Sequence, residues 1–200
     1  MTSDEMASKP LLRPENETFL GASQSLKGMF AEIIQRNFEE SVHLADHQVM
    51  DYVADLLIRF SRTEELYRIR DARGRALEDV GEMLMASNPL LDAPSFDAER
   101  EVRKHIGDFT LFFAGLFPEA VNHWRLRRAR LDAFLDYIQT GKESYYIVSE
   151  FNQFEYKSSA PLFKKLSEEF ESCVFGLNLV KRDFERMRQE SYVRARKLLI

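Results

Sequence analysis

The feature that most constrains this chain is a phenylalanine-rich stretch that runs from Ser95 to His123. Read as a helix, it places apolar side chains three and four residues apart on one stripe: Val102, Ile106, Phe109, Phe113 and Leu116. In its second half, Leu111 points the opposite way and Phe112 lies on the flank. A helix that is apolar all round has no face for water, so we expect the enclosed central helix of the fold.

The composition favours helices over strands. The 200 residues include 16 phenylalanines but only 8 glycines and 6 prolines, and no segment alternates with a period of two. A chain of this length buries roughly 70% of its unfolded surface and needs no disulfides, which fits its single cysteine. We therefore predict an all-α, single-domain bundle of about six or seven helices with a long C-terminal helix.

The domain boundaries follow from the same patterns. Residues 1–22 are polar and contain two prolines, so we expect a flexible N-terminal arm and one helical domain at 23–200. Asp46 is typical of an N-cap for a helix that carries Val49 to Phe60. The prolines in 87–94 mark a linker. We do not expect it to separate two domains, because the central helix needs partners from both halves of the chain. Gly115 and Pro118 mark a break at the end of that helix.

The C-terminal third carries the longest apolar stripe of the chain. Its members recur at helical spacing: Leu162, Leu166, Phe170, Cys173, Leu177, Val180, Phe184, Met187, Ala195 and Leu198. A continuous helix to Ile200 would be about 60 Å long at about 1.5 Å per residue, more than one compact domain covers. We therefore expect either a break near Gln189 or a tail that pairs with a partner or a second copy.

The charge distribution limits the classes of partner. The net charge of -5 argues against nucleic-acid binding, although Arg125 to Arg130 and Lys181 to Lys197 are basic and fit an acidic partner. No segment reaches the 18 or so apolar residues of a membrane span, and the N-terminus lacks a signal pattern. We expect a cytoplasmic protein without a membrane span.

His105 and Asp108 are the first candidate site residues. They lie three residues apart on the central helix, and Phe109 and Phe112 flank the carboxylate. A neighbouring imidazole would relieve the cost of burying that carboxylate, and such a pair could act as general acid and base or bind a metal. The alternative, which we favour, is that each side chain is hydrogen-bonded to the other or to a neighbouring helix at the edge of the core.

Glu119, His123 and Tyr145 complete the set of ligand or pocket candidates. Glu119 and His123 are four residues apart beyond Pro118 and join the first pair only if the chain turns back there. Glu119 is also a favourable residue for a helix N-terminus, and we prefer that interpretation. Tyr145 lies on the apolar stripe of the following helix.

No pattern in the sequence predicts a cofactor or a metal. A Glu-x-x-His step occurs once, at Glu40 and His43, whereas di-iron bundles use it twice with further inward glutamates. Glycine-rich phosphate loops and the Gly-x-Ser-x-Gly turn of hydrolases do not occur. We predict no cofactor and assign no catalytic residue.

The segment from His105 to Glu119, followed by Tyr145 and Tyr146, resembles a family of bacterial all-helical proteins. The resemblance covers about the middle third of the chain. It implies a bacterial source, and it carries no activity and no catalytic residue.

Two functional hypotheses follow. The first is a non-catalytic protein that acts by protein–protein interaction or self-association, as a dimer for example, through its C-terminal helix. The second is a small-ligand-binding protein or metal-dependent enzyme with a pocket at the central helix. Its pocket would be lined by at least three of the five candidates.

Overall fold

The computed structural model describes residues 14–88, 95–127, 133–187 and 197. Within these ranges the protein is all-α, with no strand and one isolated bridge between Arg70 and Ala76. The α-helices are α1 (Pro14–Asn37), α2 (His47–Phe60), α3 (Thr63–Leu66), α4 (Val80–Ala86), α5 (Phe96–Leu116), α6 (Pro118–Arg127), α7 (Ala133–Glu150), α8 (Ala160–Glu168) and α9 (Phe170–Met187). A π-turn, η1 (Phe38–Val42), follows α1, and a 3-10 turn, η2 (Phe154–Tyr156), precedes α8.

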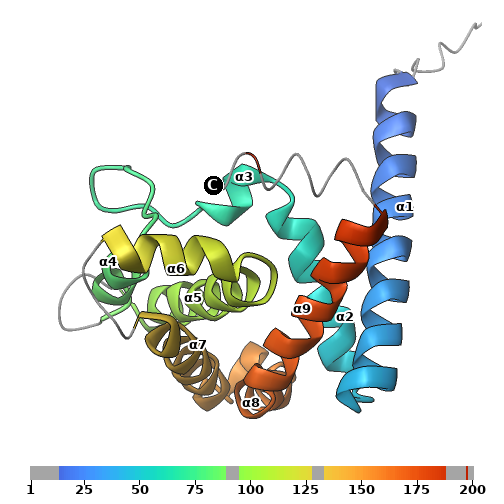
Figure 1. Ribbon diagram of the computed structural model, residues 1–200. Helices are drawn as coiled ribbons and strands as arrows, with labels where there is room; N and C mark the ends of the chain where they lie inside the picture. The colour runs from blue at the N-terminus through green and yellow to red at the C-terminus, as the bar shows by residue number, and fades with distance from the viewer. Residues whose placement is uncertain (1–13, 89–94, 128–132, 188–196, 198–200) are drawn as a thin grey trace, which may run out of the picture.

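The phenylalanine-rich helix α5 is the centre of the fold, as predicted. It lies against α7, α9, α4 and α6, and Figure 1 shows it enclosed among them. Phe109 and Phe113 are fully buried on one side of the helix, Leu111 is fully buried on the opposite side, and Phe112 is 5% exposed. The apolar residues around its whole circumference therefore reflect neighbours on every side.

The helix ends follow the local chemistry. The Asp46 carboxylate accepts hydrogen bonds from the backbone N–H groups of Gln48 and Val49, so the predicted N-cap of α2 is confirmed. The predicted break near Pro118 is confirmed as well, because α5 ends at Leu116 and α6 begins at Pro118.

The start of the first helix differs from the expected one. Helix α1 begins at Pro14, inside the segment expected to be an arm, while residues 1–13 lie outside the described residues. Proline is favourable in a first turn because its missing N–H has no partner there. At the other end of α1, the chain passes through η1 and reaches His43 with φ 60°, which explains why the apolar pattern slips before α2.

The C-terminal stripe is divided between two helices. The chain leaves α8 at Glu169 and enters α9 at Phe170, so the break lies about twenty residues before the one expected near Gln189. Six side chains on α9 are buried: Phe170, Cys173, Val174, Leu177, Val180 and Phe184. Helix α9 lies against α5 and α1, so the stripe is covered within the chain as far as Phe184, whereas Met187 at the end of α9 is 45% exposed. Self-association through residues 188–196 and 198–200 stays a prediction, because those residues lie outside the described ranges.

None of the described helices combines the length and the apolar character that crossing a membrane requires.

Helices α5 and α7 approach closely at Gly107. A Cβ atom at this position would lie 2.5 Å from Cδ1 and Cε1 of Tyr145, and the tyrosine ring has no room to retreat because it is fully buried. Gly107 is thus the position at which α5 accepts the ring of Tyr145.

We expect Gly107→Ala to lower the free energy of unfolding by about 1–3 kcal/mol, because the added methyl group overpacks the α5–α7 contact. Gly28→Ala is the matched control, since Gly28 lies exposed in α1 and a Cβ atom there meets nothing within 4 Å. That substitution should raise stability by roughly 0.5–1 kcal/mol through helix propensity. Urea unfolding measures both, and equal effects at the two positions would contradict the packing argument.

Candidate functional site

The carboxylate of Asp108 is the centre of a polar cluster inside the core. Its side chain is completely buried in α5 and accepts four hydrogen bonds. The hydroxyls of Tyr52 and Tyr145 donate to Oδ1 at 2.6 and 2.7 Å. Nη1 of Arg59 and Nζ of Lys104 donate to Oδ2 at 2.9 and 3.1 Å. Each carboxylate oxygen therefore has both of its acceptor positions occupied.

The donors fix the ionisation of the cluster. Burial alone would raise the pKa of Asp108, but the cations of Lys104 and Arg59 and the two phenols together hold it well below its usual range. Burial, reinforced by the charge of Asp108, raises the pKa of Tyr52 and Tyr145 well above their usual value. Burial by itself would lower the pKa of Arg59, yet Asp108 raises it. The cluster at neutral pH is thus one carboxylate, two neutral phenols and two cations.

The two cations lie at the edge of the protein. The side chains of Arg59 and Lys104 are 28% and 19% exposed, whereas that of Asp108 is 0% exposed. One carboxylate balances only one of them, so the edge carries an excess positive charge. Water reaches the cations, and the carboxylate that holds them in place stays in the core.

His105 is fully buried one residue from Lys104 but does not hydrogen-bond to Asp108. Its Nδ1 accepts from Nε of Arg68 at 3.2 Å, so Nε2 carries the proton and donates to the Leu66 carbonyl at 3.1 Å. Burial lowers the pKa of His105 to about 4. The cations of Arg68 and Lys104 lower the pKa further, whereas the charge of Asp108 raises it. The imidazole is neutral and both of its nitrogens are engaged.

The expectation that the imidazole compensates the buried carboxylate is therefore wrong. Arg59, Lys104 and two phenols satisfy Asp108, while His105 connects α5 to Leu66 at the end of α3 and to Arg68 just beyond it. The favoured alternative, hydrogen bonds to neighbouring helices, describes both side chains.

The remaining candidates divide into two groups. Tyr145 belongs to the Asp108 cluster and is positioned by its contact with Gly107. Glu119 lies near the start of α6 and accepts a hydrogen bond from Lys181 of α9 at 2.6 Å, and His123 is exposed on α6. The structure thus brings Asp108 and Tyr145 together, engages His105 with Arg68 and Leu66 instead, and places Glu119 and His123 elsewhere.

Sequence reasoning missed the residues that complete the cluster, namely Tyr52, Arg59 and Lys104. Tyr52 and Arg59 are seven residues apart, which places them two turns apart on one face of α2. Lys104 and Asp108 are four apart on α5. These two spacings were the available signals.

No metal centre occurs in the described ranges, where no three His, Cys, Asp or Glu side chains gather closely enough to hold an ion. His43 and His47 are exposed, apart from the Asp108 cluster.

No family model, curated protein or solved structure matches this chain. The bacterial source implied by the sequence resemblance stays a prediction.

Asp108→Asn should lower the free energy of unfolding by roughly 3 kcal/mol, because it leaves two cations without their shared counter-charge and places an amide N–H₂ against them. Asp55→Asn is a suitable control, since Asp55 is 52% exposed and pairs with an exposed Lys27. We expect that control to leave stability essentially unchanged in urea unfolding. A loss of similar size in both variants would contradict the assigned role of Asp108.

The low pKa of His105 predicts an acid-dependent loss of stability. The unfolded chain takes up this proton near pH 6.5, whereas the folded protein resists it until about pH 4. Stability should therefore fall as the pH drops from 6.5 to 4, by up to about 3 kcal/mol from this group. His105→Gln should remove that part of the slope, measured as the difference from wild type in urea unfolding across this range. His123→Gln, at an exposed position, should keep the wild-type slope; identical slopes in all three proteins would refute the assignment.

Proposed function

We propose that this protein binds a small anionic ligand, a carboxylate or a phosphate, at the edge formed by Arg59 and Lys104. The observation that carries the proposal is that two partly exposed cations share one buried counter-charge. An anion at this edge would neutralise the excess positive charge without displacing any existing contact.

Both cations have donors to spare. Among the described residues, Arg59 donates to Asp108 through Nη1, and Lys104 donates to Asp108 through Nζ. A guanidinium has five N–H groups and an ammonium has three. The remaining donors support a bidentate contact from Arg59 and a second contact from Lys104.

The edge is also preorganised. Both cations are hydrogen-bonded to Asp108, and both lie over the ring of Tyr52. The distance to the ring centroid is 5.6 Å for the guanidinium of Arg59 and 5.5 Å for Nζ of Lys104. Arg59 additionally lies 5.9 Å from the ring of Phe60. Long side chains usually lose conformational freedom when they bind, and that loss is smaller here because they are already held.

The same geometry favours holding a ligand over transferring its protons. Both oxygens of Asp108 are fully occupied, and His105 uses both ring nitrogens on protein groups. The tyrosines stay protonated at neutral pH, because their pKa values are raised. We therefore place this protein among binding proteins. Its cytoplasmic location and a second copy of the chain as partner stay predictions.

Phosphate and acetate should raise the melting temperature of the protein, whereas matched neutral compounds such as acetamide should not. A ligand at a hundred times its dissociation constant adds about 2.7 kcal/mol of stability. Lys104→Met should weaken acetate binding in calorimetric titration, and Lys142→Met, which removes a similarly exposed lysine paired with Glu171, should not. High salt should reduce the effect. Equal binding of acetate by wild type and Lys104→Met would overturn the proposal.

A further inference from the structure

Resting on the proposed anion site, we infer that its ligand is an aromatic acid, whose ring takes the place of Tyr156 over the guanidinium of Arg100. The anionic group pairs with Arg59 and Lys104, and the ring stacks one turn of α5 away.

Arg100 lies on the same face of α5 as the anion site. Arg100, Lys104 and Asp108 are spaced four residues apart, so they form one row along the helix. One such step advances about 6 Å along the axis. That backbone step is comparable to the length of one aromatic ring with its carboxylate, which is the size of ligand that the inference requires.

An aromatic wall connects the two ends of this row. The ring of Phe163, on α8, lies 5.6 Å from the guanidinium of Arg100 and 5.5 Å from the ring of Tyr52. It also lies 5.8 Å from the ring of Tyr145, which donates to Asp108. The row of cations on α5 therefore faces rings over its whole length, a lining that suits a flat apolar ligand.

The Arg100 side chain is buried without being fully satisfied. The residue is 5% exposed, and its Nε has no hydrogen-bond partner in the described part of the chain. Nη1 donates to Glu101 at 3.2 Å and Nη2 donates to Oγ of Ser159 at 3.1 Å. The ring of Tyr156 covers the guanidinium at 3.9 Å. The ring of Phe163 is farther away, at 5.6 Å, so Tyr156 is the ring that an incoming planar group would replace at this stacking site.

Tyr156 belongs to a largely exposed segment that backbone hydrogen bonds hold in place, such as the one that Tyr156 donates to the Gln153 carbonyl. From Asn152 to Ser158 every residue is exposed except Tyr156, which is itself only partly buried. Phe154 has a left-handed backbone with φ 50° and an 86% exposed side chain, an uncommon conformation for a bulky residue. The hydroxyl of Tyr156 donates to Asp97 at 2.9 Å in the first turn of α5.

Moving the ring of Tyr156 away from Arg100 therefore costs little free energy. Turning only its side chain away breaks the hydrogen bond to Asp97 and the ring contact with Arg100, keeps the backbone hydrogen bonds of Tyr156, and uncovers the guanidinium. An incoming aromatic ring restores the contact with Arg100, so the exchange is nearly balanced. The anionic group at Arg59 and Lys104 then supplies the net gain in free energy.

Calorimetric titration of the full chain with benzoate, cyclohexanecarboxylate and acetate tests the inference. Benzoate should bind more tightly than the other two. Tyr156→Ala should tighten benzoate binding by about tenfold, because the competing ring is gone, and should leave acetate unchanged. Tyr156→Phe keeps the ring and loses only the bond to Asp97, so it should tighten benzoate binding by a smaller factor.

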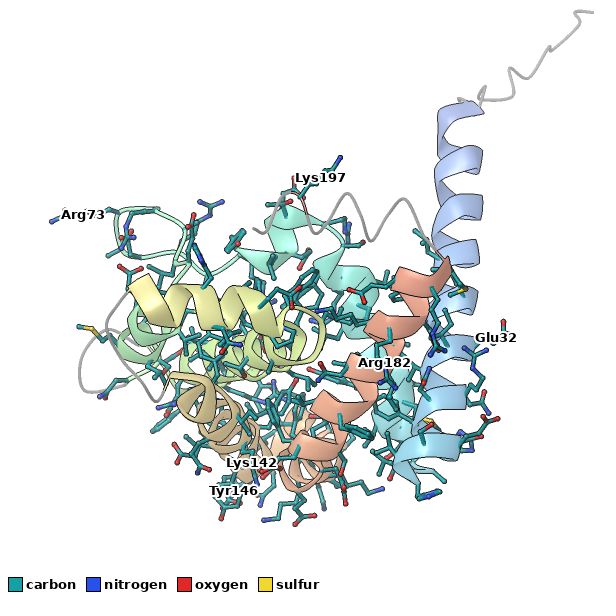
Figure 2. The ribbon with its side chains drawn as sticks, viewed as in Figure 1. Glu32, Arg73, Lys142, Tyr146, Arg182 and Lys197 are labelled. Carbon is teal, nitrogen blue, oxygen red and sulfur yellow. The ribbon has the colours of Figure 1, made fainter. Side chains whose placement is uncertain are left out.

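Tyr146→Ala is the matched control. Tyr146 is 44% exposed and also carries a cation over its ring, with Nζ of Lys164 at 4.4 Å, but it lies on the outer surface of α7 (Figure 2). This variant should bind benzoate as wild type does. If acetate and benzoate bind equally and Tyr156→Ala changes neither, the ring subsite is wrong while the anion site stands. If wild type binds neither, the proposed function fails first.

Discussion

The arrangement of the core depends on the burial of one charge. Asp108 is surrounded by aromatic side chains, where an unpaired carboxylate would cost several kcal/mol. Its four donors come from three helices: Tyr52 and Arg59 from α2, Lys104 from α5 and Tyr145 from α7. A shift of α2 by one turn would remove Tyr52 and Arg59 from the carboxylate, and a shift of α7 would remove Tyr145. The carboxylate thus sets the register of these helices, which apolar contacts alone would leave less sharply defined.

The same requirement creates the proposed binding edge. A carboxylate needs one cation for neutrality, yet Asp108 has two, and neither is fully buried. The phenols alone would have satisfied Oδ1, and one cation would have balanced the charge. The second cation adds positive charge to the surface where water and solutes have access. Residues that exceed what stability requires commonly mark functional sites, and this excess is the reason for placing the function here.

Much of the fold was predictable because it is encoded over short distances along the chain. The buried nature of α5, the Asp46 cap and the break at Pro118 each depend on residues within a few turns. His105, Asp108 and Tyr145 were identifiable because polar groups stood out on apolar helices. Tyr52 and Arg59 were not, since they lie 56 and 49 residues from Asp108. Periodicity shows that a helix face is buried but does not show which helix covers it.

The boundary between α8 and α9 also could not be predicted from apolar periodicity. The apolar spacing continues through Glu169, so the pattern predicts one long helix, whereas α8 ends at Glu168 and α9 begins at Phe170 on a different course (Figure 1), and each has a buried face. Gly141 and Gly115, which look like weak points in a helix, instead make room for Phe170 and Leu177. A glycine in one helix is explained only by the side chain of the neighbouring helix that occupies the space beside it. The information that positions the site is thus shared between helices, with Gly107 accepting Tyr145 and Tyr145 in turn donating to Asp108.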